Sequence, residues 1–273
     1  VPVGSVTLFT TLVDFHKPGD IEVFVDEASV RYLAEKMAKD IDLLLCLFPF
    51  EKGWYAKRVP GLKVEFVGHP IFDRYKEFVR SAKVDAPPLI LMLPGSRRGE
   101  LKRHLPVMTD AARRISDEER VRFKVVLPTS ELRDMAEAMC PELPNLELQT
   151  GHLPETLSQA ALAIASTGTV LLECAYFGVP TVAMYRTSWG TYQIGKRIVK
   201  VKFLSMPNIL ADEMIFPEFI QDTATPENIS NAALELLRNA TRRAAIQTRL
   251  SGIVGSLGGP GACRRASQAI LHL

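Results

Sequence analysis

The feature of this sequence that most constrains its fold is a regular alternation of short apolar runs and amphipathic segments from Leu89 onward. The apolar runs predict strands at residues 89–93, 123–127, 146–149, 161–165 and 181–185. The segments between them predict helices, at residues 131–139, 154–160, 170–177 and 192–199 and on the helix whose face carries Leu105, Met108, Ala112 and Ile115. Such alternation predicts an α/β fold with a parallel sheet covered on both faces, in which ligands bind at the carboxyl ends of the strands.

The chain before Leu89 is less regular. It predicts strands at residues 6–13, 21–25, 43–48 and 64–67 and helices at residues 31–39, 54–58 and 71–82, with a turn at residues 49–52. The stretch Ala86-Pro87-Pro88 is the best linker candidate. We therefore expect a partial N-terminal domain over residues 1–85 and a second domain over residues 86–273, whose last helix returns to the first.

Composition excludes several classes of protein. With 273 residues, a hydrophobic fraction of 47% and a net charge of +2, the chain has ample core material and no overall case for binding nucleic acid. Its four cysteines form no CxxC pair and its five histidines show no metal-ligand spacing, so we expect no metal and no disulfide framework. Cys46 and Cys174 are expected to be buried thiols, because they sit in apolar runs. The scattered cysteines indicate a protein of the reducing cytoplasm. No secretory signal is seen, and the apolar run at residues 43–50 is far too short to span a membrane.

The segment from Ser166 to Glu173 has the order strand, small-residue turn, helix. The turn residues Ser166, Thr167, Gly168 and Thr169 let a backbone approach a ligand, and the following helix N-terminus attracts an anion. Glu173, about one turn into that helix, can accept hydrogen bonds from a ribose diol. The alternative interpretation is an ordinary capped helix with Glu173 on a solvated face.

A second candidate anion site follows the first predicted strand of the regular region. Gly95 permits close approach, Ser96 supplies a hydroxyl, and Arg97 supplies a guanidinium that binds phosphate with two hydrogen bonds. A tight turn with a surface arginine is the alternative.

Three further groups are weaker candidates. Tyr185-Arg186 and the basic run at residues 196–200 suit either anionic groups or a solvated helix face. Asn208, in a predicted apolar loop at residues 207–211, binds a ligand or caps a turn. His69 ends a predicted strand and is placed to face a cleft.

These pieces together resemble the lipid-A-disaccharide synthase family. The similar segments occur in the same order and cover about residues 31 to 273. They are Phe48-Pro49-Phe50-Glu51 with Tyr55, Phe66-Val67-Gly68-His69-Pro70, Leu93-Pro94-Gly95-Ser96-Arg97 with Glu100, the Ser166–Glu173 turn, Gly178-Val179-Pro180, Tyr185-Arg186, residues 196–201, residues 205–211, Pro217-Glu218 with Gln221, residues 225–228 and residues 258–262.

The resemblance implies a two-domain GT-B glycosyltransferase of lipid A (lipopolysaccharide) biosynthesis. It would transfer 2,3-diacylglucosamine from its UDP conjugate to 2,3-diacylglucosamine 1-phosphate with inversion, releasing UDP, without metal or cofactor. By the same analogy, the donor site would use Gly95, Ser96, Arg97, residues 166–169, Glu173, Tyr185 and Asn208. The resemblance also implies a peripheral enzyme at the inner face of the bacterial inner membrane and a possible homodimer, with the basic run and apolar loops near Trp189 and Phe203 meeting the acylated substrate.

Two departures from the family pattern matter. Residues 1–30 do not match the family's opening domain, so we expect an N-terminally shortened chain whose general base lies in the missing part. Asp14 only faintly resembles the family's acidic base segment. Asp212 stands where the family usually has glycine, which puts the backbone there in doubt. The alternatives are a non-catalytic UDP-sugar-binding fragment and another GT-B enzyme that uses UDP-N-acetylglucosamine, or a 2-epimerase.

Overall fold

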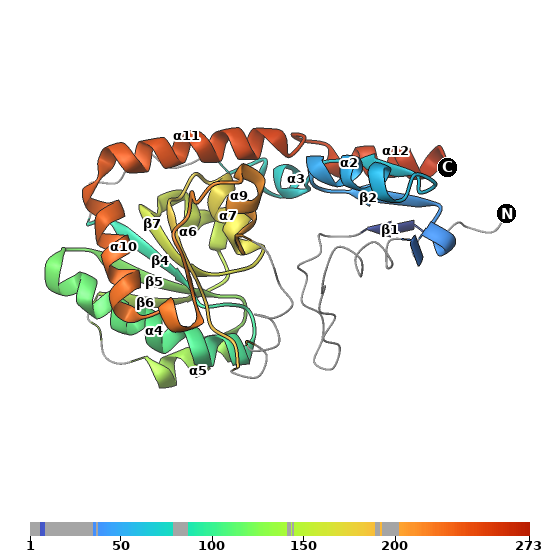
Figure 1. Cartoon of the computed structure of the whole chain (residues 1–273). Coiled ribbons are helices and arrows are strands. Elements are labelled where there is room, and N and C mark those ends of the chain that lie inside the picture. Colours follow the sequence, from blue (N-terminus) through green and yellow to red (C-terminus); the bar gives the residue numbers. More distant parts are fainter. Residues whose placement is uncertain are drawn as a thin grey trace. The chain divides into compact units, whose positions relative to one another are not determined.

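The computed structural model describes residues 6–8, 35–36, 38–78, 87–140, 143, 145–188, 192 and 202–273 (Figure 1). The chain divides into two compact units. The first takes the described residues up to Lys76 together with Gly255–Leu273, and the second takes those of Glu77–Tyr192 and Lys202–Val254. Outside the described residues lie the expected strand at residues 21–25, all but Tyr192 of the expected helix at residues 192–199, the basic run at residues 196–200, Asp14 and Trp189. Residues 79–86 also lie outside the described residues, so the domain boundary predicted after residue 85 stays a prediction.

The second unit is built on a six-stranded sheet in which every pairing is parallel. The strands are β4 (Leu89–Leu93), β5 (Arg122–Leu127), β6 (Leu146–Thr150), β7 (Leu162–Ser166), β8 (Thr181–Tyr185) and β9 (Glu218–Ile220). Their order across the sheet is β6-β5-β4-β7-β8-β9. The predicted α/β fold is confirmed, and the first five strands lie where the sequence predicts them; the sequence did not predict β9.

Helices cover both faces of this sheet, as Figure 1 shows. One layer holds α4 (Arg98–Glu118), α5 (Ser130–Met139) and α10 (Pro226–Arg238), and the other holds α6 (Leu153–Gln159), α7 (Val170–Tyr176) and α9 (Met206–Ala211). Strands covered on both sides must be apolar throughout. Accordingly, all five residues of β4 and all five of β7 are buried.

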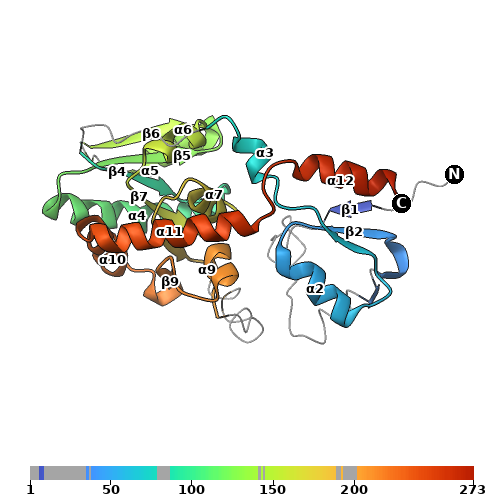
Figure 2. The same ribbon diagram turned by 90° about the horizontal axis from the view of Figure 1, so that it is seen from above.

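The first unit has a smaller parallel sheet of order β1-β2-β3, with β1 (Val6–Leu8), β2 (Leu43–Cys46) and β3 (Val64–Phe66). In Figure 2, α2 (Pro49–Arg58) and α12 (Ala262–Leu271) lie on opposite sides of β1 and β2. The predicted turn at residues 49–52 is wrong, because α2 starts there with Pro49 in its first turn, where proline needs no amide partner. The carboxylate of Glu51 accepts the backbone N–H groups of Leu47 (3.1 Å) and Phe48 (2.9 Å) and so fixes this helix start.

The C-terminal segment packs on the β3–α3 connection of the same unit, where α3 spans Ile71–Tyr75. The Asp73 carboxylate accepts the N–H groups of Gly261 (2.6 Å) and Cys263 (3.1 Å), which holds the pKa of Asp73 below its usual value. From α12, the Arg265 guanidinium donates to the carbonyl of Val67 at 2.7 Å. These charge-assisted hydrogen bonds tie segments almost 200 residues apart in sequence into one unit.

Three sequence expectations about helices, a loop and thiols have clear outcomes, and one helix was missed. The helix predicted at residues 71–82 ends at Tyr75, and residues 207–211, expected as a loop, belong to α9. Helix α11 (Ala240–Ser256) was not predicted at all. The thiols of Cys46 and Cys174 are buried and free, as expected, and burial raises the pKa of each to about 12. None of the helices in the described ranges is long and apolar enough to cross a bilayer.

Candidate functional site

The candidate site lies where the strand order of the larger sheet reverses. Strands β4 and β7 are neighbours, with Leu93 in register with Ala165, but their chains leave toward opposite edges of the sheet. The loops that follow the two strands therefore start side by side at the carboxyl edge. In open α/β sheets this is the place where ligands bind. The structure thus brings together the two small-residue turns that the sequence singled out.

The loop after β4 requires glycine at position 95. Gly95 has a φ of +120°, and a Cβ there would lie 2.4 Å from Oε2 of Glu100. The same Oε2 accepts the backbone N–H of Ser96 at 3.0 Å. Glu100, in the first turn of α4, therefore closes the loop from inside and leaves the side chain of Ser96 exposed.

Arg97 stands at the N-cap position of α4, the helix that follows this loop. Its Nη1 lies 3.7 Å from Oε1 of Glu100, and its side chain is 57% exposed. A guanidinium beside the N-terminus of a 21-residue helix concentrates positive potential at one point. That arrangement suits a phosphate group.

The loop after β7 presents backbone to solvent. Ser166 is buried at the strand end, and the N–H of Thr167 donates to the carbonyl of Met184 at 3.0 Å. Gly168 (φ +148°) and Thr169 are exposed, and nothing lies within 4 Å of a Cβ placed on Gly168. The space beside this turn is open. Glu173 follows on α7 and is half-buried.

The segment that follows β8 is held in place by Gln221, the first residue after β9. Gln221, itself in the left-handed region (φ +52°), accepts the N–H of Thr187 at 3.0 Å and donates to the carbonyl of Thr187 at 3.2 Å. Its side-chain amide thus pairs with backbone as a neighbouring strand would. Tyr185, the last residue of β8, and Arg186 are half-buried beside it.

Asn208 is fully buried, and its amide is saturated by its own chain. Its Oδ1 accepts the N–H groups of Ile215 (2.8 Å) and Phe216 (2.9 Å), while its Nδ2 donates to the Phe216 carbonyl (2.8 Å) and to Glu218 (2.7 Å). Of the two sequence interpretations, these contacts match the turn-forming one. Asn208 holds α9 to the segment before β9 and does not itself offer its amide to a ligand.

Glu218 completes this cluster. Besides Asn208, its carboxylate accepts the N–H of Leu204 (2.9 Å) and the N–H and hydroxyl of Ser205 (2.9 and 2.5 Å). The ring of Phe203 just before is buried, with 7% exposed. The expectation that the apolar loop near Phe203 meets an acylated substrate stays a prediction, and the buried ring itself packs inside the unit.

Asp212 ends α9 in the left-handed conformation (φ +48°, ψ +32°), which costs a non-glycine residue free energy. Its carboxylate is 85% exposed and lies 3.2 Å from the ammonium of Lys202, a surface pair of little value. We expect Asp212→Gly to raise the free energy of unfolding by up to about 1 kcal/mol. Urea denaturation measures this, with Asp212→Ala, which loses the ion pair and keeps the strain, as a control that stays at or slightly below the native chain. A glycine variant less stable than the alanine variant contradicts the account.

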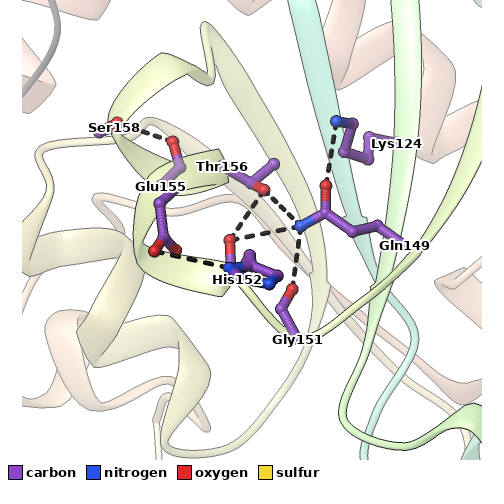
Figure 3. A network of polar contacts seen from close by, with 7 residues as sticks. All are labelled: Lys124, Gln149, Gly151, His152, Glu155, Thr156 and Ser158. Carbon is purple, nitrogen blue, oxygen red and sulfur yellow. Dashed lines mark hydrogen bonds and ion pairs between the residues drawn. The ribbon is translucent and has the colours of Figure 1, made fainter.

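A polar network that the sequence did not predict fixes the carboxyl end of β6 (Figure 3). The Gln149 amide donates to the carbonyl of Gly151 (2.9 Å) and to the hydroxyl of Thr156 (3.0 Å), and accepts from Lys124 (3.0 Å). His152 starts α6 in the left-handed region (φ +53°), and its carbonyl accepts from Thr156 at 3.0 Å. The loop between β6 and α6 is thus held rigidly at the same edge of the sheet as the candidate site.

In the first unit, His69 is held as a neutral ring. Its Nδ1 accepts the N–H of Ile71 at 3.2 Å, so the ring proton is on Nε2. Its ring centroid lies 5.5 Å from that of Phe48, and burial lowers the pKa of His69 to about 4. At neutral pH, His69 is therefore a hydrogen-bond donor through Nε2.

The lowered pKa of His69 predicts a loss of stability in acid. The ordinary pKa is 6.5, so between pH 6.5 and 4 the unfolded chain binds a proton that the folded chain refuses, and stability falls as pH falls through this window. The variant His69→Asn keeps an acceptor for the Ile71 N–H, as in an Asx turn, and does not titrate. We expect its urea midpoint to fall less between pH 7 and pH 5 than that of the native chain. His272→Asn, at an exposed position, serves as control, and equal pH dependence of all three chains would sink the prediction.

The described residues contain no group of three or more His, Cys, Asp or Glu side chains that could hold a metal ion. Several groups of the described chain at the reversal point can meet negative charge on a ligand. These groups are the guanidinium of Arg97, the backbone of the two loops and the helix starts of α4 and α7.

The fold and the paired loops define the class of this chain as a GT-B-like α/β protein. Among solved structures, it is similar to the calicheamicin glycosyltransferase CalG4 (TM-score 0.54, 18% identity, 90% of this chain and 60% of that one). It is also similar to MurG of Acinetobacter baumannii (TM-score 0.52, 18% identity, 92% and 65%). At these identities the likeness establishes the fold alone.

Sequence comparison establishes the family. The family model for lipid-A-disaccharide synthetase matches residues 29–273, so the chain belongs to the lipid-A-disaccharide synthase family. It is 31% identical to the lipid-A-disaccharide synthase of Solibacter usitatus (97% of this chain, 75% of that protein). It is 38% identical to that of Synechocystis sp. (92% and 66%) and 34% identical to that of Myxococcus xanthus (85% and 63%). The chain thus spans about two thirds of the length of these relatives.

Proposed function

We propose that this chain acts as a lipid-A-disaccharide synthase, and that its larger unit binds the UDP part of the donor at the strand-order reversal. The observation that carries the proposal is the convergence of two glycine-containing turns at the carboxyl ends of β4 and β7, one bearing Arg97 and the other leading to Glu173. The donor would be UDP-2,3-diacylglucosamine and the acceptor 2,3-diacylglucosamine 1-phosphate, as in the family to which the chain belongs.

The chemistry of this reaction suits the site. When the glycosidic bond to UDP breaks, negative charge grows on the diphosphate. Preorganised donors, here Arg97, the hydroxyl of Ser96 and the backbone of Thr167 to Thr169, stabilise such charge without a metal. The half-buried carboxylate of Glu173 would accept the ribose hydroxyls, and Tyr185 would line the pocket. Asn208 enters the proposal as the residue that positions α9, since its own amide is occupied.

Inverting transfer also needs a base that takes the proton from the acceptor hydroxyl. We place this base in the family's acceptor domain, outside the residues described here. The neutral His69, with its proton on Nε2, is not suited to this task. Work at the cytoplasmic face of the inner membrane and dimer formation remain predictions.

The test is UDP release from the two substrates. The chain is incubated with the donor alone, with the acceptor alone and with both, in the presence of EDTA, and UDP and disaccharide 1-phosphate are measured by mass spectrometry. We expect UDP and disaccharide only when both substrates are present, and more of both from a version extended at its N-terminus by the family's acceptor domain, where we place the base. UDP binding by calorimetry without turnover, also in a version extended at its N-terminus, would favour the alternative of a non-catalytic UDP-sugar-binding protein.

A further inference from the structure

One buried histidine joins the two ends of the candidate site. His104 lies on α4 with none of its surface exposed. Its Nδ1 is 2.7 Å from the carbonyl oxygen of Pro94, and its Nε2 is 3.0 Å from the backbone nitrogen of Arg186. Pro94 begins the loop after β4, and Arg186 follows the last residue of β8. No sequence signal marked His104, since a lone histidine on an apolar helix face carries no spacing information.

The contacts of His104 fix the proton on one ring nitrogen. The Pro94 carbonyl only accepts, so Nδ1 carries a proton. Nε2 lies 3.0 Å from both the backbone nitrogen and the carbonyl oxygen of Arg186. Burial, the largest influence, lowers the pKa of His104 and favours the neutral ring, in which Nε2 accepts the Arg186 N–H.

The hydrogen bonds of His104 link two segments that no strand pairing links. Strands β4 and β8 are not neighbours, because β7 lies between them. His104 thus connects the loops on either side of the β7 end, where Thr167 to Thr169 begin the exposed turn. The Tyr185 ring lies 5.8 Å from the His104 ring, and Nε of Arg103 donates to the Arg186 carbonyl at 3.2 Å, so α4 fixes the β8 end at two points.

We propose that His104 is a positioning residue for nucleotide diphosphate binding, which holds the Pro94–Arg97 turn and the Tyr185–Arg186 segment at the spacing that the diphosphate requires. This inference rests on the proposed function. His104 does not touch the ligand. It acts through the Pro94 carbonyl and the Arg186 amide. Loss of the His104 ring therefore keeps the Arg97 side chain in the protein but allows the loop that carries Arg97 to move.

The test compares three variants by UDP calorimetry and urea denaturation. His104→Leu removes both hydrogen bonds, and His104→Gln offers an N–H and a carbonyl in their place. Thr109→Val is the matched control, because Thr109 is also buried on α4 but its hydroxyl bonds only within the helix, to Leu105 (3.0 Å) and Pro106 (2.9 Å). Under conditions where all chains are folded, we expect His104→Leu to weaken UDP binding about tenfold or more. We expect His104→Gln to recover most of this loss and Thr109→Val to bind as the native chain does.

The outcomes separate the inference from the function on which it rests. If native chain and His104→Leu bind UDP equally while Arg97→Ala does not, the positioning role is wrong and the donor site stands. If Thr109→Val weakens binding as much as His104→Leu, the effect is general destabilisation, which also overturns the inference. If the native chain binds no UDP, the proposed function itself fails, and His104 is left with a purely structural part.

Discussion

Replacing Asn208 by alanine is expected to reduce the free energy of unfolding of the larger unit by about 3–5 kcal/mol, because three buried backbone groups lose their partner and the half-buried Glu218 carboxylate loses one of its donors. The contacts of the amide with the N–H groups of Ile215 and Phe216 and with the carbonyl of Phe216 are all buried, so each of these groups is left unsatisfied. The carboxylate of Glu218 loses one of the donors that compensate its partial burial. The measurement is the urea midpoint, with the slope of the transition checked for unchanged two-state behaviour.

A matched control is available in the same unit. Asn231 lies exposed on α10, and Asn231→Ala should change the free energy of unfolding by no more than about 0.5 kcal/mol. If Asn208→Ala costs less than about 1 kcal/mol, the amide is not the centre of this cluster. The ligand-binding interpretation of Asn208 would then have to be taken up again.

The second large effect is expected on UDP affinity. Arg97→Ala should weaken UDP binding by about 1–3 kcal/mol, roughly 5- to 150-fold, since charge-assisted hydrogen bonds from a guanidinium to phosphate are lost. Arg97→Lys keeps the charge but not the planar fork, and should fall between the native chain and the alanine variant. Isothermal titration calorimetry with UDP gives all three affinities.

The control for Arg97 is a cation on the same helix. Lys102 is exposed on α4, little more than one turn further on, and Lys102→Ala removes the same charge from the same region. Its UDP affinity should stay within about twofold of the native value at physiological salt, where separated surface charges are screened. Equal losses for Arg97→Ala and Lys102→Ala would mean that UDP responds to the general field of α4 and not to a site.

The buried strands could be predicted because a short run of apolar residues is compatible with few kinds of structure. A run such as the one in β4 has every residue buried, and only a strand covered on both faces or a buried helix accepts it; five residues are too few for the helix. The elements that escaped prediction lack this clarity. In α9, Pro207 lies in the first turn, and in the sequence it reads as a helix breaker. In α11, only Ile246, Leu250 and Ile253 are buried among seventeen residues, so the apolar periodicity is weak.

The site was predictable in its parts and not in its assembly. Gly95 and Gly168 mark the two turns, but only the strand order places β4 beside β7, and pairings so far apart in sequence leave no local trace. The parts of Asn208 and His104 depend on partners 7 to 82 residues away. A side chain's type fixes what it can bond, whereas the fold decides what it meets.

The central claim is that UDP binds at the reversal of strand order in the larger sheet. Hydrogen–deuterium exchange with and without saturating UDP tests it most directly. The account predicts slower exchange in the segments 94–98 and 166–170, with amides of α11 unchanged. Protection confined to other segments, or no protection in either loop at saturating UDP, would contradict it.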